Sequence, residues 1–173
     1  HPRAMAGQLQ RASKLAQRYV RRVQHRVLVT RSELRPLADL LADRGLVPVH
    51  VPLIARVATN APTPGGPPDL LLVSSPAVCE FVPDLHRMTG GAPAVAVGEA
   101  TAAALRTIGV TVAAVGPGGG SGAVDALARL VGDHERTIWH VGGLRLSAAL
   151  RAALGDWGAP VSRWSVYRTS PTQ

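Results

Sequence analysis

Cysteine, lysine and aromatic residues are scarce in this sequence. Cys79 is its one cysteine, which excludes a disulfide within the chain and a cluster of thiolate metal ligands, and favours a reducing, cytoplasmic compartment. No apolar run approaches the roughly 20 residues that a membrane-spanning helix needs, so we expect no membrane partner. The histidines are scattered along the sequence, and we therefore expect no metal site.

Acidic residues are absent from the first 26 positions, which hold seven basic ones. The remainder has twelve arginines and eleven acids, so the net charge of +8 belongs almost entirely to the N-terminal segment. Apolar side chains recur there at helical spacing, which indicates a basic amphipathic arm over residues 1–25. A helix that packs on the body, or a remnant of an upstream segment, is the simpler interpretation. A transit peptide, a membrane-surface anchor and a nucleic-acid arm are the alternatives, and we expect contact with nucleic acid only through this arm.

Short apolar runs alternate with amphipathic stretches after the arm. The expected strands span residues 26–30, 47–54, 69–73, 94–97, 110–115, 136–141 and 159–167. This alternation predicts the α/β class, with a parallel sheet covered by helices on both faces. A Pro/Gly linker at 58–68 separates a β-α-β segment at 26–57 from a second α/β unit at 69–165. Residues 166–173 are expected to form a polar crossover.

Two β-α-β units of the sequence are similar to one another. Four residues recur at a constant offset of 113 positions: Leu37, Leu41, Asp43 and Gly45 match Leu150, Leu154, Asp156 and Gly158. Amphipathic helices that stop at glycine are common in βαβ designs, so chance agreement is the alternative to duplication. We favour duplication. The first copy is followed by a further block that the second copy lacks, so we expect about half a domain to be missing from the chain.

Hydroxyl side chains follow two of the expected strands. Ser74 and Ser75 precede Pro76, which is favoured at the first position of a helix, and Gly98 precedes Thr101 in the next helix. Helix N-termini of this kind can bind carboxylate or phosphate, and plain helix capping is the alternative. The glycine-rich turn GPGGGSG lacks the ending of a phosphate-binding loop, so we interpret it as a flexible turn. For His140 we expect a solvated or capping role.

Four segments together resemble the uroporphyrinogen-III synthases. In order along the chain they are VLVTR, LLVSSPAV, AVAVGEATAAALRTIG and LSAALRAALGDWGAPVSRWSVYRTSP, and the resemblance covers about residues 26–171. It implies two flavodoxin-like α/β lobes joined by a pair of crossovers, with the C-terminal part of the first lobe absent from this chain. It also implies a cytoplasmic enzyme that converts hydroxymethylbilane, a linear tetrapyrrole polycarboxylate, to uroporphyrinogen III by dehydration, inversion of the terminal pyrrole and ring closure, without a cofactor.

The same resemblance implies the site residues. Tyr167 matches the family's cleft tyrosine, which is thought to assist loss of the hydroxyl, although an ordinary strand aromatic is the alternative. Substrate contacts are implied for seven residues: Thr30, Arg31, Ser74, Ser75, Gly98, Thr101 and Arg145. The sequence departs from the family at Gly142-Gly143, where Arg-Gly is usual, and at Ser74-Ser75, where Thr-Ser is usual.

Two other functions remain open on the sequence. One is a synthase-like ligand-binding or regulatory module without catalysis, and the other is a flavodoxin-like protein that binds a phosphorylated ligand. The chain alone is expected to show little cyclisation, as a monomer or a domain-swapped dimer.

Deletion of residues 1–24 should leave the fold intact, because the body has its own alternating strands and helices. Thermal unfolding of the shortened and complete chains measures this. Loss of the cooperative transition on deletion would show that the arm is structural.

Overall fold

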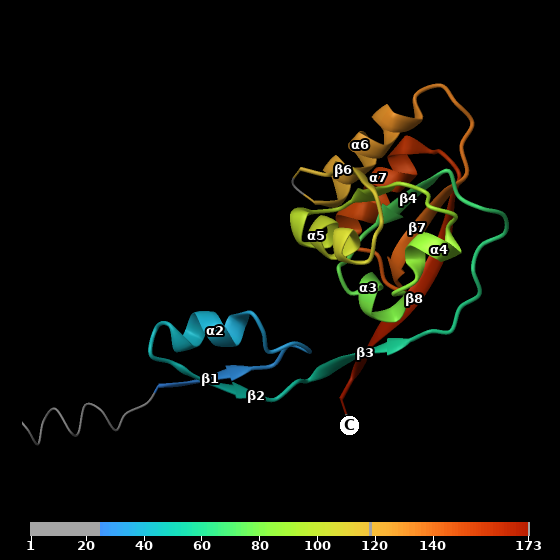
Figure 1. Cartoon of the computed structure of the whole chain (residues 1–173). Coiled ribbons are helices and arrows are strands. Elements are labelled where there is room, and N and C mark those ends of the chain that lie inside the picture. The colour runs from blue at the N-terminus through green and yellow to red at the C-terminus, as the bar shows by residue number, and fades with distance from the viewer. Residues whose placement is uncertain (1–24, 118, 173) are drawn as a thin grey trace, which may run out of the picture. The chain divides into compact units, whose positions relative to one another are not determined.

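The structure is a computed structural model that describes residues 25–117 and 119–172, so the predicted arm lies outside the described residues except at its last position. The described residues form two compact units (Figure 1). The first comprises residues up to Ala55 together with the C-terminal Pro171 and Thr172, and the second runs from Arg56 to Ser170. Within the described part, no helix combines the length and apolar character needed to cross a membrane.

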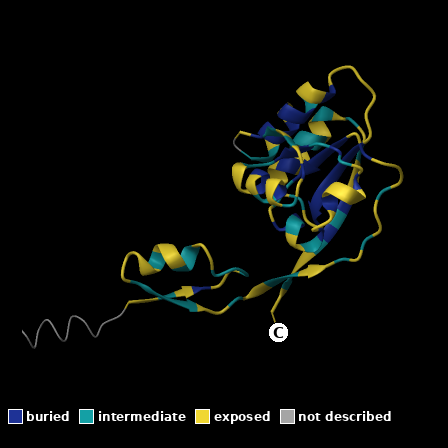
Figure 2. Cartoon of the chain, viewed as in Figure 1, coloured by how far each residue is buried: buried dark blue, intermediate teal, exposed yellow. Residues whose placement is uncertain are grey.

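The first unit is a small β-α-β element. Strand β1 (Arg26–Val29) pairs in parallel with β2 (Val47–His50), and helix α2 (Leu37–Ala42) connects them. The strand expected at 47–54 therefore ends at His50, and a separate strand begins at Ile54. Among the unit's described residues only Val29 is buried, and Figure 2 shows this element mostly in teal and yellow.

The second unit is built on a six-stranded sheet of order β3-β8-β7-β4-β5-β6. Its strands are β3 (Ile54–Ala58), β4 (Leu70–Val73), β5 (Ala94–Ala96), β6 (Val112–Val115), β7 (Ile138–Gly143) and β8 (Val161–Pro171). The pairings from β8 to β6 are all parallel. At the β3 edge, Thr59 N–H donates to Val166 O and Trp164 Nε1–H donates to Ala61 O, so β3 and β8 run in opposite directions.

Helices cover both faces of this sheet. They are α3 (Val78–Phe81), α4 (Leu85–Met88), α5 (Glu99–Thr107), α6 (Gly120–Val131) and α7 (Ala148–Trp157). Successive side chains of a strand point to opposite faces. Leu71 and Val73 accordingly pack with α3, α4 and α5, whereas Leu70 and Leu72 pack with α6 and α7. The predicted α/β class with a parallel, helix-covered sheet is therefore confirmed, and its central strands are buried (Figure 2).

The last strand is longer than the sequence indicated. Residues 166–173 were expected to form a polar crossover, and strand β8 continues through most of them to Pro171. Directly after the end of the strand, Thr172 N–H donates a hydrogen bond to Leu53 O. Pairing with the edge strand β3, rather than apolar content, extends β8 through these polar residues, and the crossover itself stays a prediction.

The two similar β-α-β units also share their helix ends. Gly45 has a φ of 69° and Gly158 a φ of 71°, so both adopt the left-handed conformation in which a glycine ends a helix. In both units the flanking strands pair in parallel. Their duplication stays a prediction, since this topology is common.

Candidate active site

The carboxyl ends of the parallel strands place the candidate residues along one edge of the sheet. Ser74 and Ser75 follow β4, Gly142 and Gly143 close β7, and Gly98 comes soon after β5. Because β7, β4 and β5 are neighbours with parallel pairing, these positions lie side by side. Ligands of open α/β sheets bind at this edge.

Tyr167 reaches this edge through an irregularity in β8. Gly142 pairs with Ser165 but Gly143 pairs with Tyr167, so the register shifts by one residue. Such irregularities redirect a side chain. A Cβ atom at Gly143 would lie 3.0 Å from the Tyr167 ring and 3.2 Å from its hydroxyl, which means that the ring sits against bare backbone. Phe81 stacks on the same ring with centroids 5.4 Å apart.

Tyr167 and Arg145 line one pocket. The pocket has a volume of about 260 Å³ and is lined by Gly143, Leu144, Arg145, Tyr167, Arg168 and Thr169. Two hydrogen bonds hold its β7–α7 loop on β8: Leu144 N–H donates to Tyr167 O at 2.8 Å, and Arg163 Nη2 donates to Leu144 O at 3.0 Å. The structure therefore brings together two residues that were predicted 22 positions apart in the sequence.

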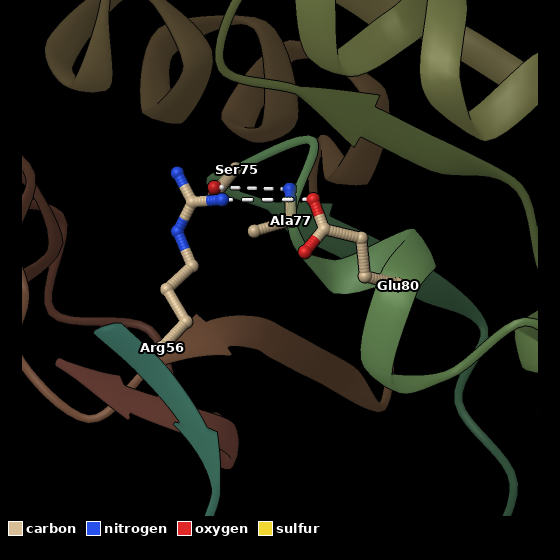
Figure 3. A network of polar contacts seen from close by, with 4 residues as sticks. All are labelled: Arg56, Ser75, Ala77 and Glu80. Carbon is tan, nitrogen blue, oxygen red and sulfur yellow. Dashed lines mark hydrogen bonds and ion pairs between the residues drawn. The ribbon is translucent and has the colours of Figure 1, made fainter. Parts of the chain in front are cut away.

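Arg56 is a member of this site that the sequence did not reveal. Its guanidinium lies 6.0 Å from the centroid of the Tyr167 ring, and its Nη1 lies 3.5 Å from Glu80 Oε1 (Figure 3). Arg56 belongs to β3, whose pairing with β8 across more than 100 residues has no local sequence signal. Arg56 thus lies beside the Tyr167 ring, and Arg145 and Arg168 line the pocket next to it, which is a set of residues suited to carboxylates.

Ser75 opens the segment that follows β4. Its Oγ accepts a hydrogen bond from Ala77 N–H at 3.2 Å (Figure 3), and its carbonyl accepts one from Val78 N–H. Helix α3 has only four residues, begins at Val78 and has Ala77 as its N-cap without a side-chain cap, so Ser75 stabilises the turn before the helix and does not cap it as expected.

His140 differs from the expectation of a solvated or capping residue. It is fully buried in β7, and its Nε2 lies 3.0 Å from Ser74 Oγ. Burial lowers the pKa of His140 to about 4, and the positive charge of Arg163 acts in the same direction. The expectation failed because the alternation of β7 directs residue 140 into the α6/α7 face, like Ile138.

The serine–histidine contact does not form a catalytic nucleophile. The buried Nδ1 of His140 has no hydrogen-bond partner within residues 25–117 and 119–172, so no acid orients the ring there. A histidine with a pKa of about 4 is also a weak base at neutral pH. The contact therefore orients the Ser74 side chain and does not deprotonate its hydroxyl.

The remaining predicted residues are not among those that line the Tyr167 pocket. Gly98 is the N-cap of α5, in extended conformation, and Thr101 is buried on the inner side of that helix. Thr30 and Arg31 follow β1 in the first unit; the Thr30 carbonyl accepts from Leu53 N–H, and His50 Nε2 lies 2.9 Å from Arg31 O. In the described ranges, no group of three or more His, Cys, Asp or Glu residues is placed to hold a metal ion.

A family model described as uroporphyrinogen-III synthase HemD matches residues 35–173, which is more than half of the chain. The chain belongs to the uroporphyrinogen-III synthase family. This confirms the resemblance inferred from the four sequence segments. A comparison with curated proteins gave no match.

Solved structures of uroporphyrinogen-III synthases share the fold. The enzyme from Helicobacter pylori 26695 aligns with a TM-score of 0.62 and 15% identity over 87% of this chain and 64% of that chain. A mutant uroporphyrinogen III synthase from the extremely thermophilic bacterium Thermus thermophilus aligns with a TM-score of 0.54 and 21% identity over 86% of this chain and 64% of that one. The chain thus spans slightly less than two thirds of the length of these synthases.

His140 should make the stability of this synthase-family chain depend on pH. The unfolded histidine has a pKa of 6.5 and the folded one about 4, so acid protonates the unfolded state first. The stabilisation is complete above the unfolded pKa and is lost as the pH falls toward the folded pKa. Between pH 6.5 and about pH 5 we expect a loss of about 2 kcal/mol, measured by urea denaturation.

Two variants isolate this contribution. His140→Gln should flatten the pH dependence over that interval, whereas His86→Gln, at an exposed position, should leave it unchanged. Equal slopes for the parent chain and His140→Gln would show that the buried histidine does not set the dependence.

Proposed function

We propose that the protein is a uroporphyrinogen-III synthase, which cyclises hydroxymethylbilane with loss of water and inversion of the terminal pyrrole ring. The observation that carries this proposal is the pocket in which Tyr167 lies among arginines at the carboxyl edge of the sheet. Family membership supports the same reaction. We place the reaction in the cytoplasm, with the linear tetrapyrrole as the partner.

The substrate explains why the site is rich in hydrogen-bond donors. Hydroxymethylbilane carries acetate and propionate carboxylates along a flexible chain, and ring closure requires its two ends to be held together. Arg145 and Arg168 line the pocket at exposed positions, where a guanidinium can bind a carboxylate with two hydrogen bonds. Arg56 is held by Glu80 beside the Tyr167 ring, so a substrate carboxylate can compete with Glu80 for it.

Tyr167 is the residue proposed to act on the leaving group. Its phenol transfers a proton to the terminal hydroxyl of the substrate, which departs as water when the C–O bond breaks. The proton that ring closure releases from the attacked pyrrole restores the phenol. The pyrrole nitrogen of the substrate supplies the electron pair and becomes cationic. The protein therefore stabilises developing charge and orients the chain, and the substrate provides the reactive electrons.

The strand ends are proposed to bind the rest of the tetrapyrrole. Ser74, Ser75 and Gly98 lie on the same edge of the sheet as the Tyr167 pocket. Thr101, from the first turn of α5, and Thr30 and Arg31, from the first unit, complete the proposed set on the family resemblance. Hydroxyl and backbone donors suffice for such contacts.

In the protein as its complete gene encodes it, Tyr167→Phe should lower turnover about a hundredfold, because it removes a proton donor from the reacting group. The melting temperature should change little, since Phe retains the ring that stacks on Phe81. The assay measures the rate of formation of the type III isomer, because closure without inversion gives a different ring isomer.

Ser162→Ala, at an exposed position of the same strand, is the matched control and should keep full activity. Unchanged turnover in Tyr167→Phe would reduce Tyr167 to a packing residue. Absence of any type III isomer from the unmodified protein would refute the proposed function.

A further inference from the structure

Strand geometry brings His140 and Ser74 together on the α6/α7 face of the sheet. Leu72 of β4 lies opposite His140 of β7, so Ser74, two residues on, lies beside Gly142. A Cβ atom at Gly142 would come within 2.3 Å of Ser74 Oγ and within 2.9 Å of the His140 ring. The hydrogen bond between them therefore exists only because residue 142 lacks a side chain.

The surroundings of the His140 ring favour one tautomer. Its Nδ1 is buried and has no partner among the residues that the structure describes. A buried N–H donor without a partner is rarer in proteins than an acceptor left unsatisfied. The proton of the neutral ring therefore belongs on Nε2, the nitrogen that lies 3.0 Å from Ser74 Oγ.

This tautomer fixes the direction of the Ser74 hydroxyl. When Nε2–H donates to Ser74 Oγ, the serine oxygen acts as the acceptor, and its own proton is directed elsewhere. Ser74 is only half-buried and stands at the carboxyl end of β4. A hydroxyl whose oxygen already accepts one bond is a stronger donor to an anion, because hydrogen bonds in a chain polarise one another.

We propose that His140 is a positioning residue: it donates Nε2–H to Ser74 and thereby directs the Ser74 hydroxyl proton to a carboxylate of the tetrapyrrole. The inference rests on the proposed function for the identity of the ligand. It adds His140 to the site as a group that acts through Ser74 and does not touch the substrate.

The tautomer is measured first, without a ligand. Long-range ¹H–¹⁵N spectra of the 173-residue chain, labelled at histidine, report which ring nitrogen carries the proton. At neutral pH the resonance assigned to His140 through the His140→Gln spectrum should show a protonated Nε2 and an unprotonated Nδ1. The opposite tautomer would overturn the inference alone, because the proposed function does not depend on it.

The contact with a carboxylate is measured next, by titration with uroporphyrin as the probe. Ser74→Ala and His140→Leu should each weaken binding about tenfold, the effect of one hydrogen bond to a charged group. The double variant should bind no more weakly than either single variant, because both changes remove the same contact. His140→Gln, whose amide can replace the Nε2–H donor, should restore most of the affinity.

Two controls separate this effect from general damage. Ser162→Ala and His86→Leu change the same residue types at exposed positions and should bind uroporphyrin like the parent chain. The cooperative unfolding of each variant shows that it is folded. Equal affinity of the parent and folded His140→Leu would overturn the positioning role, whereas failure of the parent itself to bind would overturn the carboxylate contact together with the proposed function.

Discussion

The site depends on the absence of side chains at the last two positions of β7. Side chains at positions 142 and 143 would point to opposite faces of the sheet. Because both residues are glycines, another residue occupies the space on each face. On the α6/α7 face Gly142 admits the contact between His140 and Ser74, and on the other face Gly143 admits the ring of Tyr167. A Cβ atom at Gly142 would overlap Ser74 Oγ, so glycine is a steric requirement at that position, whereas a Cβ atom at Gly143 would require the Tyr167 ring to shift by a few tenths of an ångström.

The same constraint suits the proposed reaction, because the described residues offer neither an activated nucleophile nor a metal cluster. The parts of the site are hydrogen-bond donors: the Tyr167 phenol, the guanidinium groups of Arg56, Arg145 and Arg168, and hydroxyls at strand ends. A linear polycarboxylate that already contains its leaving group and its electron pairs needs orientation and charge stabilisation above all. The central strands β4 and β7 hold these donors in place because both strands are buried along their whole length.

Much of the fold follows from local patterns, and the site follows only in part. Alternating apolar runs and helical stripes indicate the parallel sheet, and the ordered segments indicate the family. The sequence could not show that β8 continues to Pro171 or that Arg56 lies beside Tyr167, since both depend on pairing with β3, which is remote in the chain. His140 was misjudged for a related reason: its burial is set by helices that pack over β7 and not by its sequence neighbours. The glycine at position 142, where the family usually has arginine, was visible in the sequence. Only the structure shows that it leaves space for the contact between Ser74 and His140.

Uroporphyrin affinity of three glycine variants tests this account most directly. Gly155 lies in α7 with open space where a Cβ atom would be, so Gly155→Ala is the matched control and should bind like the parent chain. Gly142→Ala and Gly143→Ala should each raise the dissociation constant about tenfold or more, because the added methyl displaces Ser74 in one case and Tyr167 in the other. Equal dissociation constants for all three variants would contradict the claim that these two glycines build the site.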